Sequence, residues 1–489
     1  MKKDNEFDKK TGKFFVIFIA IHLVVWTLLC FVRHLLPVDA MEGIVWGSYL
    51  DFGTHKHPPL IGWISYLVYG LFGHKDIAIY LIGQICAVIG FIYTYKLGKL
   101  FLSRNLAIYS VMILEGCFSY SYMSIFDGFN PNFIIFITFP AIAYHLYRAL
   151  HRNLLKDWLY LGLFVGISLL AKYQSILIVA SILVFIAIYR QHLKCFLNYK
   201  LYLSVLTAVL INVPHLLWLI KYDFFSWKYF FLREGASTLI EHFTIPLEFL
   251  FVQLAALAGT FVIFGIIYSK YKEKSKNINK EDAVYILIMG YLPLLLQSLP
   301  SIFTGEKLMT TWGFPMLYIT GIVLFYFFPV KTNEESFSLF NKCVYSVMAI
   351  IFIFLFTLFS VEKNFRSTYP YETISKDLKV IYKNETGKDL KYVTGYIEFA
   401  LPLTIYGKMN PQIIFTTYGH KNPWIDDEDV KRNGFMIIAR GDDAVYEYTV
   451  ANAQDYVDKP YSVYYFKIKN KLNQEKEYPL FYKIVMPQK

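Results

Sequence analysis

Residues 37–60 read PVDAMEGIVWGSYLDFGTHKHPPL and lie between two strongly apolar segments. This stretch concentrates side chains that are costly to place near lipid, namely Asp39, Glu42, Asp51, His55, Lys56 and His57. Ionisable groups kept at the edge of a membrane segment usually serve a function there. We therefore expect this loop to be the functional centre and the rest of the chain to hold it in place.

The composition is that of a membrane protein. Of the 489 residues, 56% are hydrophobic and 17% are charged, and several apolar runs exceed the ~20 residues that span a bilayer. The net charge of +11 does not predict a nucleic-acid partner, because the basic residues flank apolar runs and follow the cytoplasmic preference for positive charge. The five cysteines lie in or beside apolar runs and give neither a disulfide framework nor a paired zinc-ligand spacing.

Apolar segments recur along residues 1–360 and predict about eleven transmembrane helices. They lie at about 14–32, 77–95, 106–125, 132–147, 158–171, 174–189, 201–220, 246–268, 283–298, 312–329 and 343–360. The first is too long for the apolar part of a signal peptide, so we expect an uncleaved anchor. Lys172 divides the run 158–189, which predicts either a hairpin of two tilted helices or one helix with a polar break.

Basic residues cluster in alternate loops and set the expected orientation. The clusters on the side of the N-terminus are Lys96, Lys99 and Arg104; Arg148, Arg152 and Lys156; Arg190, Lys194 and Lys200; residues 270–280; and Lys331 with Lys342. We predict a multi-pass protein of the inner (plasma) membrane whose N-terminus is cytoplasmic. The loop 37–60 and the C-terminal region are then extracytoplasmic.

The composition changes after Ser360, which predicts a transmembrane domain at 1–360 and a small α/β extracytoplasmic (periplasmic) domain at 361–489. Five segments have the pattern of strands, at 391–395, 412–416, 435–440, 461–468 and 480–485. Helices are expected at 374–382 and 398–406, and another begins near Asp426. A short apolar helix at 60–72, after the rigid Pro58-Pro59 corner, is expected to lie along the membrane surface.

The loop holds the residue types needed for group transfer from a phosphate. Asp39 and Glu42 share one face of a helical turn, and Lys56 and His57 add positive charge after a glycine-containing turn. A carboxylate removes a proton from an acceptor, and cations stabilise a departing phosphate. A simpler interpretation is that the carboxylates cap the helix and Lys56 extends to the surface. A divalent metal held by Glu42, His55 and His57 is possible but not indicated, and no cofactor is predicted.

The chain resembles the bacterial branch of the protein-mannosyltransferase-like family, the GT-C glycosyltransferases of family 39 type related to lipid A aminoarabinose transferase. The resemblance runs through most of the chain in motif order: PVDAME at 37–42, KHPPL at 56–60, FNPN at 129–132, AKY at 171–173, GEKLMTTWGFP at 305–315 and NPWID at 422–426. It implies a polyprenyl-phosphate sugar donor, inverting transfer on the outer face and a catalytic acidic residue in the first outer loop. Relatives often carry adjacent Asp-Glu, whereas here the acids stand at 39 and 42, so both Asp39 and Glu42 are candidates for the base.

Further polar positions are candidates for binding. The basic residue before the prolines contacts the lipid phosphate in relatives, which implies Lys56 or His57. Three other cations are candidates for the donor phosphate, Lys172, Arg233 and Lys307, and three residues are expected to line the cavity, Asp127, Asn130 and Glu306. The simpler interpretations are helix capping for Asp127 and Asn130, an extended surface side chain for Lys172 and an interface anchor for Glu306 with Lys307.

The resulting expectation is a transferase that uses a lipid-linked sugar. Its partners would be the polyprenyl-phosphate-linked sugar, membrane lipid and an envelope acceptor, whether lipid A or lipopolysaccharide, a surface glycan or a protein. Two rivals remain: a flippase or transporter of lipid-linked glycans, and a non-catalytic envelope assembly protein. Transporters tend to show internal repeats and mid-membrane charges, and this chain instead concentrates its charges in outer loops.

Overall fold

The computed structural model describes residues 2–33, 35–122, 126–231, 235–236, 238–274, 278–361, 369–415, 425–439, 462–469 and 475–488. The chain folds into two compact units. The first contains residues 1–31, 77–218 and 233–358, and the second contains residues 32–76, 219–232 and 359–489. The second unit thus combines the charged loop with the C-terminal region.

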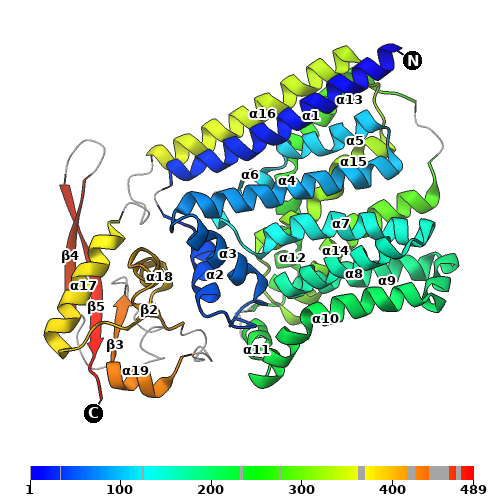
Figure 1. Ribbon diagram of the computed structural model, residues 1–489. Helices are drawn as coiled ribbons and strands as arrows, with labels where there is room; N and C mark the ends of the chain where they lie inside the picture. The colour runs from blue at the N-terminus through cyan, green and yellow to red at the C-terminus, as the bar shows by residue number, and fades with distance from the viewer. Residues whose placement is uncertain are drawn as a thin grey trace. The chain divides into compact units, whose positions relative to one another are not determined.

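The first unit is helical (Figure 1). Its α-helices are α1 (Lys2–Leu28), α4 (Asp76–Phe101), α5 (Arg104–Met112), α6 (Phe118–Tyr122), α7 (Pro131–Arg152), α8 (Leu155–Ala171), α9 (Ile176–Ile188), α10 (Tyr199–Lys221), α12 (Glu241–Ala256), α13 (Ala258–Tyr271), α14 (Lys280–Thr304), α15 (Thr320–Phe327) and α16 (Glu334–Val361). Short 3-10 helices join several of them: η1 (Leu29–Phe31), η2 (Ile113–Gly116), η4 (Tyr173–Ser175), η5 (Arg190–Leu197), η6 (Thr310–Trp312) and η7 (Phe314–Ile319).

Over the described residues, six helices are long and apolar enough to cross a membrane, or up to eight if each of two bent pairs is one span. The six lie at 6–31, 76–101, 131–152, 199–221, 280–304 and 334–360. The bent pairs are α9 with η5, at 114°, and α12 with α13, at 48°. These helices make the chain a multi-pass membrane protein, as the composition predicted.

Three of the eleven predicted apolar runs form shorter or broken helices in the described part of the chain, so the number of spans stays a prediction. The run 106–125 is interrupted at η2, where Gly116 lies directly against the backbone of Gly259. The run 158–171 ends when Lys172 adopts an extended conformation with φ −157° and ψ 130°. The run 312–329 begins as 3-10 turns around Pro315. Lys172 therefore separates two helices, α8 and α9, rather than lying within one.

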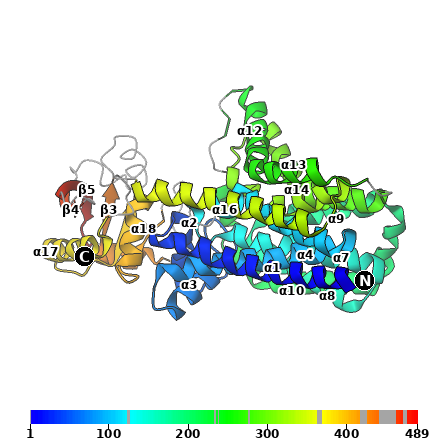
Figure 2. The same ribbon diagram turned by 90° about the horizontal axis from the view of Figure 1, so that it is seen from above.

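Aromatic rings and close approaches hold the first unit together. α1 and α16 lie side by side in both views (Figures 1 and 2), and Phe337 of α16 packs edge-on against Phe7 and Phe14. Elsewhere the helices touch at small residues: a Cβ at Gly162 of α8 would lie 2.2 Å from the carbonyl oxygen of Ser204 in α10. Small residues at helix contacts are a common device in membrane proteins, because they allow backbones to approach.

The second unit contains α2 (Val38–Ser48), α3 (Leu60–Leu71), α11 (Phe225–Phe231) and a mixed sheet with its helices. The strands are β1 (Tyr392–Gly395), β2 (Gln412–Ile413), β3 (Phe435–Ala439), β4 (Ser462–Lys469) and β5 (Glu475–Val485), in the spatial order β2-β1-β3-β5-β4. β1 pairs in parallel with β2 and β3, whereas β5 pairs antiparallel with β3 and β4. The associated helices are α17 (Tyr371–Thr386), α18 (Ile397–Tyr406) and α19 (Asp427–Asn433).

The sequence-based prediction of this region is confirmed element by element. All five predicted strands are present, and α17 and α18 overlap the two predicted helices. Asp426 caps α19, since its side chain accepts a hydrogen bond from the backbone N–H of Glu428. The strand segments could be recognised because they are rich in β-branched and aromatic residues. The division of the chain at residue 360 stays a prediction.

Tyr406, the last residue of α18, fastens both ends of the loop-bearing segment. Its hydroxyl donates a hydrogen bond to Asp76 Oδ2 at 2.7 Å and accepts one from the backbone N–H of Leu36 at 3.1 Å. Leu36 precedes α2, and Asp76 follows α3. One phenol therefore holds the beginning and the end of residues 37–75 against α18, which itself packs on α2.

We predict that Tyr406→Phe destabilises the protein, because it removes both hydrogen bonds and leaves two polar partners in a largely buried place. The expected cost is about 1–3 kcal/mol, observed as a lower melting temperature of the detergent-purified full-length chain. Tyr465→Phe is the matched control, since Tyr465 is 59% exposed. Equal melting temperatures for the Tyr406 and Tyr465 variants would contradict the role given to this hydroxyl.

Candidate active site

Close packing of α2 on α3 fixes the shape of the charged loop. A Cβ at Gly47 of α2 would lie 2.0 Å from the carbonyl oxygen of Gly62 in α3, and one at Gly43 would lie 2.8 Å from Ser65 Oγ. The two helices can approach this closely only because these positions carry no bulky side chain. The residues between them, 49–59, consequently form a short connection whose two ends are held together.

A turn at residues 54–57 presents Lys56 and His57. Thr54 Oγ1 accepts hydrogen bonds from the backbone N–H of Lys56 at 3.2 Å and of His57 at 2.8 Å, and it donates to the carbonyl of His57 at 2.9 Å. The carbonyl of Thr54 in turn accepts a hydrogen bond from Ser226 of α11. Thr54 thus positions the basic residues. Thr54 was not among the residues predicted from the sequence, although a threonine that bonds nearby backbone groups is a known turn signal.

Lys56 and Glu42 form an ion pair in which the carboxylate is buried. Lys56 Nζ lies 2.6 Å from Glu42 Oε1 and 2.8 Å from Oε2, and the Glu42 side chain is 1% exposed against 21% for Lys56. Burial raises the pKa of Glu42 to about 7, although the neighbouring Lys56 ammonium opposes the increase. The carboxyl group therefore exchanges its proton near neutral pH, while the lysine above it remains in reach of water.

Asp39 has the opposite environment. It lies one helical turn before Glu42, in the first turn of α2, and its side chain is exposed. Among the described residues it accepts no hydrogen bond and forms no ion pair, so its carboxylate is open to an incoming group. As predicted, the two acids lie three residues apart in one helical turn. Their surroundings nevertheless separate them into one accessible and one buried carboxyl group.

The loop histidines pack around Trp46 of α2. The Trp46 ring meets His55 edge-on at 5.6 Å between ring centroids and His57 at 5.8 Å. His55 is 2% exposed and also lies 4.8 Å from the ring of Phe415. Burial, followed by the charges of Lys56 and His57, lowers the pKa of His55 well below its usual value, so this imidazole is neutral. The ligand atoms of Glu42, His55 and His57 do not gather in a metal-binding arrangement.

A second polar cluster lies in the first unit and joins two of the sequence motifs. Lys172 Nζ, 7% exposed, donates to Asn132 Oδ1 at 2.6 Å and lies 5.6 Å from the centre of the Trp312 ring. Asn130 caps α7 by accepting a hydrogen bond from the backbone N–H of Asn132. FNPN and AKY thus meet through Asn132 and Lys172. Asn132 belongs to the FNPN motif, but the sequence alone predicted no role for its side chain.

The remaining candidates are spread over this first unit. Asp127 precedes Gly128, whose φ of +64° turns the chain into the cap of α7. Glu306 forms an isolated β-bridge with Gly235, and Lys307 beside it is exposed. Arg233 lies outside the described residues. The structure therefore brings Glu42, Lys56 and His57 together in one compact unit, and Asn130 and Lys172 together in the other.

Comparison with known structures identifies the fold. The crystal structure of ArnT from Cupriavidus metallidurans bound to undecaprenyl phosphate matches with a TM-score of 0.63, at 13% identity over 96% of this chain and 97% of that one. The chain has a GT-C fold. The same protein in the apo state matches with a TM-score of 0.62. In sequence, residues 56–218 match the family model described as dolichyl-phosphate-mannose-protein mannosyltransferase.

Curated relatives carry glycosyltransferase names. Lipopolysaccharide core galacturonosyltransferase RgtA of Rhizobium johnstonii is 26% identical over 187 residues, which are 38% of this chain and 37% of that protein. RgtB of the same organism is 23% identical over 300 residues, 58% of this chain and 59% of RgtB. The undecaprenyl phosphate-alpha-4-amino-4-deoxy-L-arabinose arabinosyl transferase 2 of Proteus mirabilis is 23% identical, over 38% of this chain and 34% of that protein. The alignments thus span between 34% and 59% of these relatives.

We predict that the Glu42 carboxyl makes stability depend on pH. Because its folded pKa of about 7 exceeds the ordinary 4.5, its contribution to stability is fully present below about pH 4.5 and is lost as the pH rises through 7. The melting temperature of the wild type relative to Glu42→Gln should therefore fall between pH 5 and pH 8. Glu372→Gln, at an exposed position paired with Lys376, should give a flat difference over this interval. A wild-type advantage that grows with pH would mean that attraction to Lys56 outweighs burial.

Proposed function

We propose that the chain is an inverting GT-C glycosyltransferase that moves a sugar from a polyprenyl phosphate to a cell-envelope acceptor. The observation that carries the proposal is the exposed carboxylate of Asp39, one helical turn from the buried Glu42–Lys56 pair. The donor class is supported by the undecaprenyl phosphate bound to ArnT in the crystal structure with the matching fold. The acceptor class is supported by the lipopolysaccharide core named in two relatives.

In this proposal Asp39 is the general base. The acceptor hydroxyl gives its proton to the Asp39 carboxylate while its oxygen forms a bond to the anomeric carbon of the sugar. The bond from that carbon to the phosphate oxygen breaks from the opposite side, and the phosphate leaves with the bonding electrons. The configuration at the anomeric carbon is thereby inverted. An exposed carboxylate that pairs with no cation of the described residues suits this role, because an acceptor can reach it without displacing a lysine.

Lys56 stabilises the phosphate, with His57 beside it. An arriving lipid phosphate competes with Glu42 for Lys56 Nζ, and charge-assisted hydrogen bonds to phosphate are strong. Glu42 can yield the lysine by taking a proton, since burial raises its pKa to about 7. The ion pair then keeps Lys56 in position while no lipid-linked sugar is bound. When a phosphate arrives, protonation of Glu42 leaves the Lys56 ammonium available to it. Glu42 is accordingly an orienting partner rather than the base.

The cations outside the loop are proposed as further donor contacts. Lys172 is held by Asn132 and by the face of Trp312, so its ammonium has a defined position within the first unit. Lys307 and Arg233 complete the proposed set, and Asp127, Asn130 and Glu306 are proposed to line the cavity. The basic clusters support a matching topology. In this proposal the loop 37–60 and residues 361–489 lie on the outer face of the inner membrane, and the N-terminus lies in the cytoplasm.

Replacing Asp39 and Glu42 by their amides, one at a time, shows which of the two acids is the general base. Asp39→Asn should lower turnover by about 10²–10⁴ and leave donor binding and membrane abundance unchanged, because only the proton acceptor is lost. Glu42→Gln should keep turnover within about tenfold of wild type. Turnover is measured as release of undecaprenyl phosphate from a panel of undecaprenyl-phosphate-linked sugars, with an envelope extract as acceptor.

Asp389→Asn, an exposed carboxylate in the C-terminal region paired with Lys383, is the control and should behave as wild type. If Glu42→Gln loses turnover while Asp39→Asn retains it, the two roles are reversed. If both variants keep full turnover, the reaction centre is not in this loop.

Binding of undecaprenyl phosphate without a sugar tests the cationic residues. Lys56→Ala should weaken it by about 1.5–3 kcal/mol, the range for a hydrogen bond to a charged group, and Lys172→Ala should weaken it in the same direction. Lys376→Ala removes an exposed charge from α17 and should leave affinity unchanged. Equal affinities for the Lys56, Lys172 and Lys376 variants would remove both lysines from the phosphate site.

A further inference from the structure

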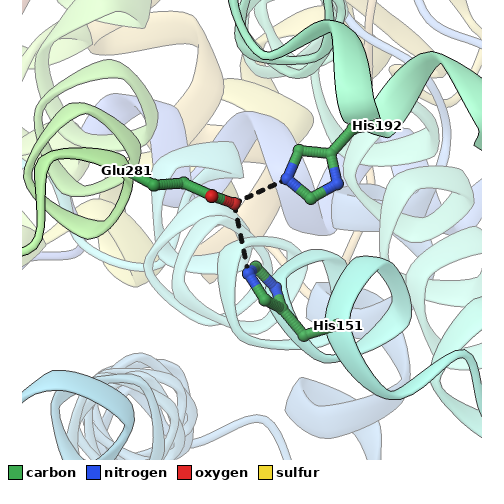
Figure 3. A group of neighbouring side chains, drawn as sticks. All are labelled: His151, His192 and Glu281. Atoms are coloured by element: carbon green, nitrogen blue, oxygen red, sulfur yellow. Dashed lines mark hydrogen bonds and ion pairs between the residues drawn. The ribbon is translucent and has the colours of Figure 1, made fainter.

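Two histidines and a glutamate converge at the ends of three helical elements in the first unit (Figure 3). His151 comes from the last turn of α7, His192 from η5 and Glu281 from the first turn of α14. Glu281 Oε1 lies 2.6 Å from His192 Nε2 and 3.2 Å from His151 Nε2. The three ligand atoms all lie within 4.8 Å of one another. The cluster shares no residue with the candidate active site.

The hydrogen bond on the far side of His151 decides which of its nitrogens carries a proton. His151 Nδ1 lies 2.8 Å from the carbonyl oxygen of Tyr147, and a carbonyl can only accept, so Nδ1 carries the proton. In the neutral ring Nε2 then presents a lone pair, and it faces a carboxylate oxygen that also only accepts. Two acceptors at this distance need a cation between them, either a second proton on the ring or a metal ion.

Metal-binding histidines commonly have this arrangement. A ligating imidazole usually donates its other ring N–H to a backbone carbonyl or a carboxylate, which fixes its orientation and makes the free nitrogen a better ligand. Glu281 is supported in a similar way, because Gln191 Nε2 donates to its second oxygen at 2.7 Å. His151 also stacks on Tyr147, at 4.0 Å between ring centroids, and His192 stacks on Phe185 at 5.6 Å. The orientation of each ligand is thus set by a neighbour.

We propose that His151, His192 and Glu281 bind one Zn²⁺ ion. Two imidazole nitrogens and one carboxylate oxygen are a known zinc ligand set, and a fourth position remains for water. With zinc–ligand distances of about 2.0–2.2 Å, two ligands on a tetrahedral ion lie about 3.3 Å apart. The 3.2 Å between His151 and Glu281 already meets this spacing. The 2.6 Å between His192 and Glu281 has to open slightly, by a rotation within the Glu281 side chain.

The ion would join elements that are far apart in the sequence. η5 follows a bend of 114° after α9, and the zinc would fix it to the end of α7 and the start of α14. The site adjoins the basic clusters at 148–156, 190–200 and 270–280, on the side proposed to face the cytoplasm. The His151 side chain is 32% exposed, so the ion can enter from water. The role is structural: the ion holds three helical elements together and takes no part in the transfer.

Zinc titration of the detergent-purified full-length chain tests the proposal, with ZnCl₂ alone as the probe. The wild type, first stripped with a chelator, should take up one zinc per chain, release protons into weakly buffered solution and melt at a higher temperature. His151→Ala and His192→Ala should each bind at least about 100-fold more weakly, since a direct ligand is worth no less than its supporting partner. Mg²⁺ should not replace zinc, because it prefers oxygen ligands.

Glu281→Gln keeps the size and shape of the side chain and one of its two acceptor oxygens but removes its charge, so it separates metal binding from folding. It should melt near the zinc-free wild type and show no zinc-dependent shift. His74→Ala, an exposed histidine outside the cluster, should bind zinc as the wild type does. Failure of the wild type to bind more zinc than the His151→Ala/His192→Ala double variant would overturn the proposal and leave a histidine–glutamate hydrogen-bond cluster. Neither result depends on the transferase activity.

Discussion

The buried ion pair of Glu42 and Lys56 is the interaction on which the loop depends. A carboxylate with 1% of its surface exposed is expensive to bury, and a single lysine that stays in contact with water offsets part of that cost. Two sets of neighbouring contacts keep the two groups at hydrogen-bonding distance. Gly47 and Gly62 let α2 and α3 touch, and Thr54 closes the turn that carries the lysine. The loop is therefore a rigid connection rather than a flexible one.

The same pair explains how two acids in one helical turn acquire different chemistry. Asp39 projects from the first turn of α2 into solvent, whereas Glu42 faces the packed interior of the unit. A helix that packs on protein along one side exposes the other side to solvent, so two residues three positions apart can lie on either side of that boundary. Burial raises the pKa of Glu42, and proteins commonly use such a difference in environment to divide roles between neighbouring carboxyl groups.

Local patterns predicted much of the fold, and contacts between distant segments set the limit. The five strands, α17 and α18 followed from residue patterns within each segment, and the start of α19 followed from Asp426, all of which act over a few residues. Three apolar runs are shorter or interrupted for reasons that composition does not show: the close approach of Gly116 to Gly259, the extended conformation of Lys172 and the 3-10 turns around Pro315. Asn132 with Lys172, and His151 with His192 and Glu281, could not be paired from the sequence, since no fixed spacing relates residues on different helices. Asp39 and Lys56 could be named as candidates from the sequence because they lie close together in one short loop.

The contact of Tyr406 with Leu36 and Asp76 also affects how this protein can be recombined. Residues 37–75 are held at both ends by a side chain that the chain supplies more than three hundred residues later. A chimaera that exchanges the C-terminal region alone would replace Tyr406 with an unrelated residue. The loop would then lose the hydrogen bonds at Leu36 and Asp76. Segments 32–76 and 359–489 form parts of one compact unit, together with 219–232, and should be exchanged as a set. A loop transferred alone would lack the contacts with α18 that hold its two ends.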